Sequence, residues 1–153
     1  MFGIFKRKLK IKNFCQKKFD YIFSNSGKET MDKMILYCDL SIEDSQRQYF
    51  EDHFIAIYFE IHRIAINTNL SKEITYQSYN IMIDYFKKKK CSYIDEIRED
   101  YRLAFNSDCF DGIKVMADKF ANEFSTDPEK VCTIFYFLAT SYVEEIKKLR
   151  IVL

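Results

Sequence analysis

Two histidines and five cysteines are the residues of this sequence that could act as a base, a nucleophile or a soft metal ligand. His53 and His62 are nine residues apart in a segment with helical periodicity, so they point to different sides of one helix. The Glu-x-x-His spacing of di-iron bundles and the His-Glu-x-x-His spacing of zinc proteases are both absent. We therefore interpret both histidines as structural or surface residues.

The cysteines are odd in number and widely spaced, and no Cys-x-x-Cys pair occurs, so neither a disulfide framework nor a structural zinc site is expected. Cys15 lies among lysines, whose charges could lower the pKa of its thiol and make it reactive. Its place on an apolar stripe favours a core position instead. The five are Cys15, Cys38, Cys91, Cys109 and Cys132.

Carboxylates gather on two predicted helices and could bind a cation or do acid–base work. Asp95 and Glu99 share one helix face, as do Glu96 and Asp100. A solvated helix face is the interpretation we favour for both groups. The group on the longer helix consists of Glu43, Asp44, Glu51, Asp52 and Glu60. The chain has only three glycines and no glycine-rich phosphate loop, so we expect no cofactor and no metal.

The most distinctive feature is the charge of residues 1–19, which hold seven cations and no acid, while the rest of the chain carries −6. This segment could lie on an anionic membrane, with apolar residues inserting. It could also dock on an acidic protein, or pack on the acidic residues 39–60 of its own body, which is the interpretation we favour. Nucleic acid is a weaker option, because the body is acidic and no helix-turn-helix pattern occurs. The cations are Lys6, Arg7, Lys8, Lys10, Lys12, Lys17 and Lys18, and the apolar residues are Phe2, Ile4, Phe5 and Leu9.

Apolar residues at helical spacing predict a compact all-α bundle of six or seven helices, mostly with antiparallel neighbours and without a sheet. We expect one domain over residues 1–153, whose basic first helix, about residues 4–24, is either part of the body or a semi-independent arm. Ser26 with Glu29 and Ser41 with Asp44 are predicted helix starts. Asp127 before Pro128 is the sharpest start signal in the chain. The predicted core residues include Phe54, Ile57, Ile61, Ile64, Phe135 and Leu138.

The longest predicted helix, about residues 42–68, is apolar on two sides. One stripe runs through Phe50, Ile57 and Ile61, and the other through Ile55, Phe59 and Ile66. Such a helix either is central to the core or presents one stripe to solvent as an interface.

We expect a non-catalytic protein-interaction module that pairs with itself or binds a basic partner, such as a toxin that it neutralises. The expected contact surface combines Ile55, Phe59 and Ile66 with Glu43, Asp44, Glu51 and Asp52. A membrane-surface protein that uses the basic segment and an enzyme assembled from dispersed residues are the alternatives. The cysteines, expected as free thiols, indicate a reducing compartment, and neither a secretory signal nor a long apolar run occurs, so the expected location is the cytoplasm.

Overall fold

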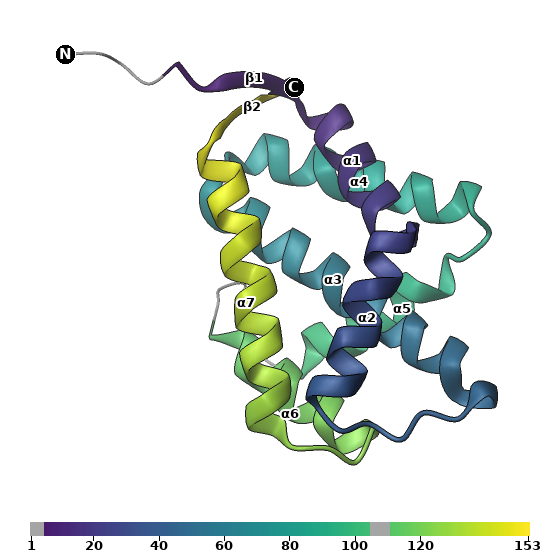
Figure 1. The fold of residues 1–153 in the computed structure, drawn as a ribbon. Helices are drawn as coiled ribbons and strands as arrows, with labels where there is room; N and C mark the ends of the chain where they lie inside the picture. Colours follow the sequence, from purple (N-terminus) through teal and green to yellow (C-terminus); the bar gives the residue numbers. More distant parts are fainter. Residues whose placement is uncertain (1–4, 105–110) are drawn as a thin grey trace.

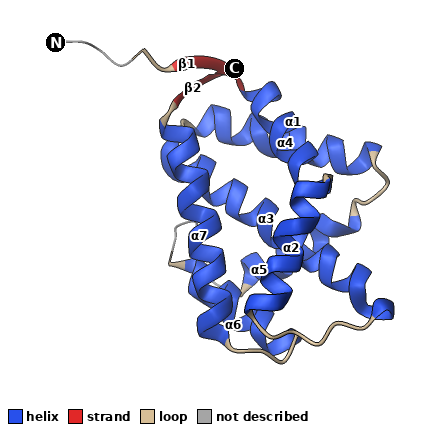
Figure 2. Ribbon diagram, in the orientation of Figure 1, coloured by secondary structure: helices blue, strands red, loops and turns tan. Residues whose placement is uncertain are grey.

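The computed structural model describes residues 5–104 and 111–153, and it is 78% helical (Figure 1). Seven α-helices, one 3₁₀ turn and two short strands make up the described chain, as the colours of Figure 2 show. In chain order they are β1 (Arg7–Lys10), α1 (Ile11–Phe23), α2 (Asn25–Tyr37), η1 (Asp44–Gln46), α3 (Arg47–Asn69), α4 (Lys72–Lys88), α5 (Tyr93–Leu103), α6 (Gly112–Glu123), α7 (Pro128–Lys147) and β2 (Leu149–Val152). The all-α bundle predicted from periodicity is confirmed.

Helix α3 is the centre of the bundle, because α4, α5, α6 and α7 all pack against it. Both of its apolar stripes are therefore covered by neighbouring helices, and thirteen of its residues are buried. The predicted core is confirmed at five of its six positions, which are 0% exposed: Phe54, Ile57, Ile61, Ile64 and Phe135. The sixth, Leu138, is only half-buried, because it lines a groove described below.

The starts of several helices differ from those expected, and hydrogen bonds give the reason. Ser24 caps α2 in place of Ser26: its hydroxyl oxygen accepts from the Gly27 amide at 3.3 Å. Gly27 is required there, because a Cβ atom would lie 2.5 Å from the carbonyl oxygens of Tyr21 and Ile22. Ser41 caps nothing, since α3 begins at Arg47 after a 3₁₀ turn. The start of α7 is confirmed, with Asp127 accepting from the Glu129 amide at 2.9 Å.

The prediction of a helix from about residue 4, and of no sheet, was wrong. Residues 7–10 form β1, which pairs in parallel with β2, so the two ends of the described chain lie together at the top of Figure 1. Consecutive cations at a helix N-terminus would face the positive end of the helix dipole, which disfavours the expected helix there. In the strand, Leu9 instead pairs with Ile151, and both residues pack on the core. Helix α1 contributes six buried residues and is an integral part of the body.

Candidate interaction surfaces

The apolar part of the predicted contact surface is buried within the chain. Ile55, Phe59 and Ile66 are 5%, 1% and 1% exposed, because α3 is central. The prediction that they form an interface was therefore wrong. Self-association through this stripe is ruled out for the same reason. The other possibility that the two stripes raised, a central helix, is the one that the structure shows.

The acidic part of that predicted surface is divided between internal contacts and solvent. Glu51 pairs with Arg47 of its own helix at 3.3 Å. Asp52 accepts hydrogen bonds from Gln48 at 2.8 Å and from the Tyr93 hydroxyl at 3.2 Å. Glu43 and Asp44 are exposed and form no ion pair with any residue that the structure describes. These two remain available to a partner.

Glu60, predicted on a solvated face, is fully buried beside two arginines. Its carboxylate accepts from Arg98 at 2.9 Å and from Arg63 at 2.9 and 2.5 Å. Arg98 is 2% exposed and also pairs with Asp95 at 2.7 Å and with Glu99 at 2.9 Å. Asp95 and Glu99 of α5 thus serve as partners of arginines, and this network ties α5 to the central helix.

His62 is the centre of a polar network that the spacing of residues in the sequence did not predict. One ring nitrogen hydrogen-bonds the Tyr142 hydroxyl, and the other lies 2.5 Å from the Ser78 hydroxyl. The Cys15 sulfur lies 3.4 Å from the same Ser78 oxygen. All four residues are at most 2% exposed. Burial lowers the pKa of His62 to about 3, so the ring is neutral near pH 7.

This network has the residue types of a nucleophilic site but not its accessibility. A base with a pKa near 3 takes up a proton poorly near neutral pH. Burial also raises the pKa of the Cys15 thiol to about 11, which opposes formation of the reactive thiolate. The neighbouring lysines therefore do not activate Cys15. Its interpretation as a core residue is confirmed.

The remaining histidine and cysteines also take structural places. His53 hydrogen-bonds the Tyr101 hydroxyl at 2.8 Å, on the side of α3 that faces α5 and α6. Cys38 and Cys91 are buried and Cys132 is half-buried, all as free thiols, while Cys109 lies outside the described residues. Within residues 5–104 and 111–153, no cluster of three or more such side chains could hold a metal ion.

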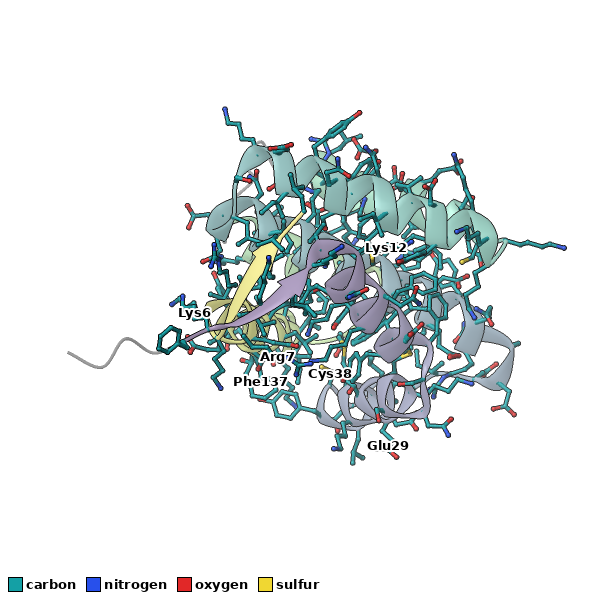
Figure 3. The ribbon with its side chains drawn as sticks, turned by 90° about the horizontal axis from the view of Figure 1, so that it is seen from above. Lys6, Arg7, Lys12, Glu29, Cys38 and Phe137 are labelled. Carbon is teal, nitrogen blue, oxygen red and sulfur yellow. The ribbon has the colours of Figure 1, made fainter. Side chains whose placement is uncertain are left out.

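The two ends of the described chain, around β1 and β2, form a basic surface, which we call the basic end. It consists of eight exposed cations from β1, the start of α1, the end of α7 and β2: Lys6, Arg7, Lys8, Lys10, Lys12, Lys147, Lys148 and Arg150. Lys147 is 3.7 Å from Glu144, and the other seven make no ion pair within the described chain. In the sheet, Lys8 lies directly opposite Arg150, a like-charge pair that costs stability. Figure 3 shows this end, with Lys6 at the outer end of β1 and Lys12 at the start of α1.

The expected packing of the basic segment on acidic residues 39–60 does not occur. Lys17 and Lys18 pair instead with Glu145 of α7, and the cations of β1 face solvent. Of the apolar residues expected to insert into a membrane, Phe5 is fully exposed, whereas Leu9 packs against the core. Phe2 and Ile4 lie outside the described residues.

The loops at the opposite end of the molecule, far from β1 and β2 in Figure 1, carry several exposed acidic residues. There the loop after α2 meets the loop before α7: Thr126 donates to the Cys38 carbonyl at 2.6 Å, and Lys130 pairs with Asp39 at 2.9 Å. Exposed acids on these loops and on the adjoining elements are Asp39, Glu43, Asp44, Glu123, Asp127 and Glu129. A negatively charged surface would attract the eight cations of the basic end and repel these acids.

A groove of about 530 Å³ lies between α1, α2 and α7, with Tyr58 of α3 at its floor. Phe137, 69% exposed, stands at its rim beside the half-buried Leu138. The lining residues are Lys17, Lys18, Tyr21, Thr30, Tyr58, Phe137, Leu138, Ser141, Tyr142 and Glu145. Most of the surface is apolar or aromatic, and the charged groups gather where α1 meets α7.

Comparisons with protein families, with curated proteins and with solved structures found no match. Among the described residues, no helix is long and apolar enough to cross a membrane. The arguments about function that follow therefore rest on the surfaces of this chain alone.

Proposed function

We propose that the protein is a non-catalytic interaction module that docks through its basic end on the surface of an anionic membrane. The observation that carries this proposal is the gathering of eight exposed cations, seven of them without an ion-pair partner in the described chain, at one end of the molecule. Chain ends that are far apart in sequence bring these charges together. A polyanionic surface would relieve the repulsion between Lys8 and Arg150.

Phe5 favours a membrane over an acidic protein as the partner of this end. It extends fully exposed from β1, next to Lys6 and Arg7. Basic residues are drawn to anionic lipid by roughly 1 kcal/mol each near the surface. An aromatic ring that enters the interface adds apolar burial to that attraction. The acidic opposite end would then point away from the membrane and fix the orientation of the molecule.

The buried polar network around His62 supports a non-catalytic function, because its potential nucleophile and base are poorly suited to react. His62, Ser78 and Cys15 are sealed in the core, and the low pKa of His62 makes it a poor base near neutral pH.

A basic partner protein, such as a toxin, is a second candidate, now carried by the acidic end. Glu43 and Asp44 are exposed there without ion-pair partners among the described residues. Charges of this kind steer an oppositely charged protein. The two candidates use opposite ends, so charge reversal at one end distinguishes them.

Co-sedimentation with vesicles tests the membrane proposal. The test variant reverses two charges at the basic end, Lys8→Glu with Arg150→Glu, and the matched control reverses Lys28 and Lys33 on α2. We expect binding to vesicles of phosphatidylcholine and phosphatidylglycerol, weaker binding at high salt, and a loss of roughly a hundredfold, about 3 kcal/mol, for the test variant. Equal loss in both variants, or equal binding to vesicles of phosphatidylcholine alone, would contradict the proposal.

A further inference from the structure

We propose that the groove between α1, α2 and α7 is a binding site for a single-chain anionic amphiphile, with its acidic head against the lysines and its apolar tail along α7. This site is separate from the basic end and does not depend on the proposed membrane docking. Its volume, its unpaired hydroxyl and its charge each support this ligand class.

The hydroxyl of Tyr58 points to a ligand, because it has no partner in the described chain. Tyr58 is only 5% exposed, yet no residue within 5–104 or 111–153 forms a hydrogen bond to its hydroxyl. Among the described residues, every side-chain nitrogen or oxygen that is fully sealed from solvent has a hydrogen-bond partner. The unpartnered Tyr58 hydroxyl is therefore not fully sealed, and it reaches the groove that Tyr58 lines. Buried hydroxyls are normally hydrogen-bonded. A donor in a recess of this kind fits an acidic acceptor on a ligand.

Two ammonium groups share one carboxylate at the same place, which leaves a net positive charge. Lys17 pairs with Glu145 at 2.7 Å, and Lys18 binds the other oxygen of that carboxylate. Lys18 is only 8% exposed, and its ammonium lies 4.4 Å from the Tyr142 ring centroid. Each ammonium has three donors, of which Glu145 takes one. An acidic head can accept from those that remain.

The remainder of the groove fits an apolar chain. Phe137 stands 69% exposed at its rim, and Leu138 and the aromatic ring of Tyr21 continue the wall. Burial of an exposed ring and of a ligand chain against it removes apolar surface from water, which favours binding. A volume of about 530 Å³ is in the range of small-molecule sites.

Decanoate is the probe for this site, and decyltrimethylammonium is its cationic counterpart with the same chain. We expect titration calorimetry to give one decanoate per protein and much weaker binding of the cation. Equal binding of the two amphiphiles, or no decanoate binding, would overturn the proposal.

Tyr58→Phe is the decisive variant, because it removes a hydroxyl that no described protein group uses. We expect its unfolding free energy to be unchanged while decanoate affinity falls by about tenfold, the value of one hydrogen bond to a charged group. Tyr76→Phe, at an exposed tyrosine of α4, is the matched control and should leave affinity unchanged. Unchanged affinity in Tyr58→Phe would refute the role of this hydroxyl.

The apolar wall is tested by Phe137→Asp, an exposed position where folding is not at risk. We expect loss of decanoate binding, whereas Tyr136→Asp, next to it on α7 and outside the groove, should bind normally. The Lys8→Glu/Arg150→Glu variant should also bind decanoate normally while failing to bind vesicles. Loss of both activities in that variant would show that a single surface serves both ligands and would overturn the separate site.

Discussion

His62 should make the fold sensitive to acid well before most carboxylates are protonated. Its imidazole is enclosed by Phe14, Phe59 and Tyr142 and is held by neutral hydroxyl groups. Burial lowers its pKa from 6.5 to about 3, and the nearby Lys18 charge acts in the same direction. As the pH falls below about 6.5, His62 is therefore protonated in the unfolded chain but not in the folded chain.

The sign and the size of the effect follow from this difference in pKa. The free energy of unfolding is unaffected by the titration of His62 above pH 6.5. It falls progressively as the pH decreases from 6.5 toward 3, because the unfolded chain binds a proton at His62 and the folded chain does not. The full difference corresponds to about 5 kcal/mol, at about 1.36 kcal/mol per pKa unit. Between pH 7.5 and pH 4.5, we expect His62 alone to lower the free energy of unfolding by about 3 kcal/mol.

Urea titrations of the wild type and of His62→Gln at a series of pH values isolate the part of the pH-dependent stability that is due to His62. The variant cannot titrate at position 62, so the carboxylates common to both proteins cancel in the difference. We expect the variant to be less stable at pH 7.5 and to approach wild type at pH 4.5. A constant difference across this range would refute the argument and show that the folded protein accepts a proton on His62. Direct titration of the ring by NMR should show no charging above pH 4.5.

Three further predictions concern stability, measured as the free energy of unfolding in denaturant. Arg98→Met should cost about 3–5 kcal/mol, because it leaves Glu60 with one fewer cation in the core. The control Arg102→Met, at a side chain 36% exposed, should cost under about 1 kcal/mol. Similar costs for the two variants would contradict the buried network. Phe135→Ala should cost about 3–5 kcal/mol, with Phe137→Ala as a nearly neutral control. Gly27→Ala should destabilise by more than about 1 kcal/mol, because its Cβ atom would meet two carbonyl oxygens at 2.5 Å, and an unchanged midpoint would show that the α1–α2 junction relaxes.

Features with a local cause could be predicted from the sequence. The two stripes of α3 follow from residues spaced along one helix, and the start of α7 follows from Asp127 and Pro128. The stripes alone left open whether α3 is central. The helices that cover both of them resolved that question.

Features that depend on distant partners could not be predicted in this way. The sheet pairs Arg7 with Leu149, and the groove needs Tyr58 beside α7, so neither has a signal within one segment. Glu60 has a weak signal: it stands between Phe59 and Ile61 on a helix that is apolar on both sides, where a solvated face has no room. His62 has the same context. A polar residue within a helix that is apolar on both sides is expected to be buried and hydrogen-bonded.

The central claim, docking of the basic end on an anionic membrane, is tested most directly by fluorescence of a single tryptophan. The sequence has no Trp, so Phe5→Trp places one reporter at the basic end, and Tyr37→Trp, at the end of α2, places one toward the acidic end. With vesicles that contain phosphatidylglycerol, we predict a blue shift and quenching by brominated lipid for Trp at position 5, and neither for position 37. Quenching at position 37 with none at position 5 would contradict the account.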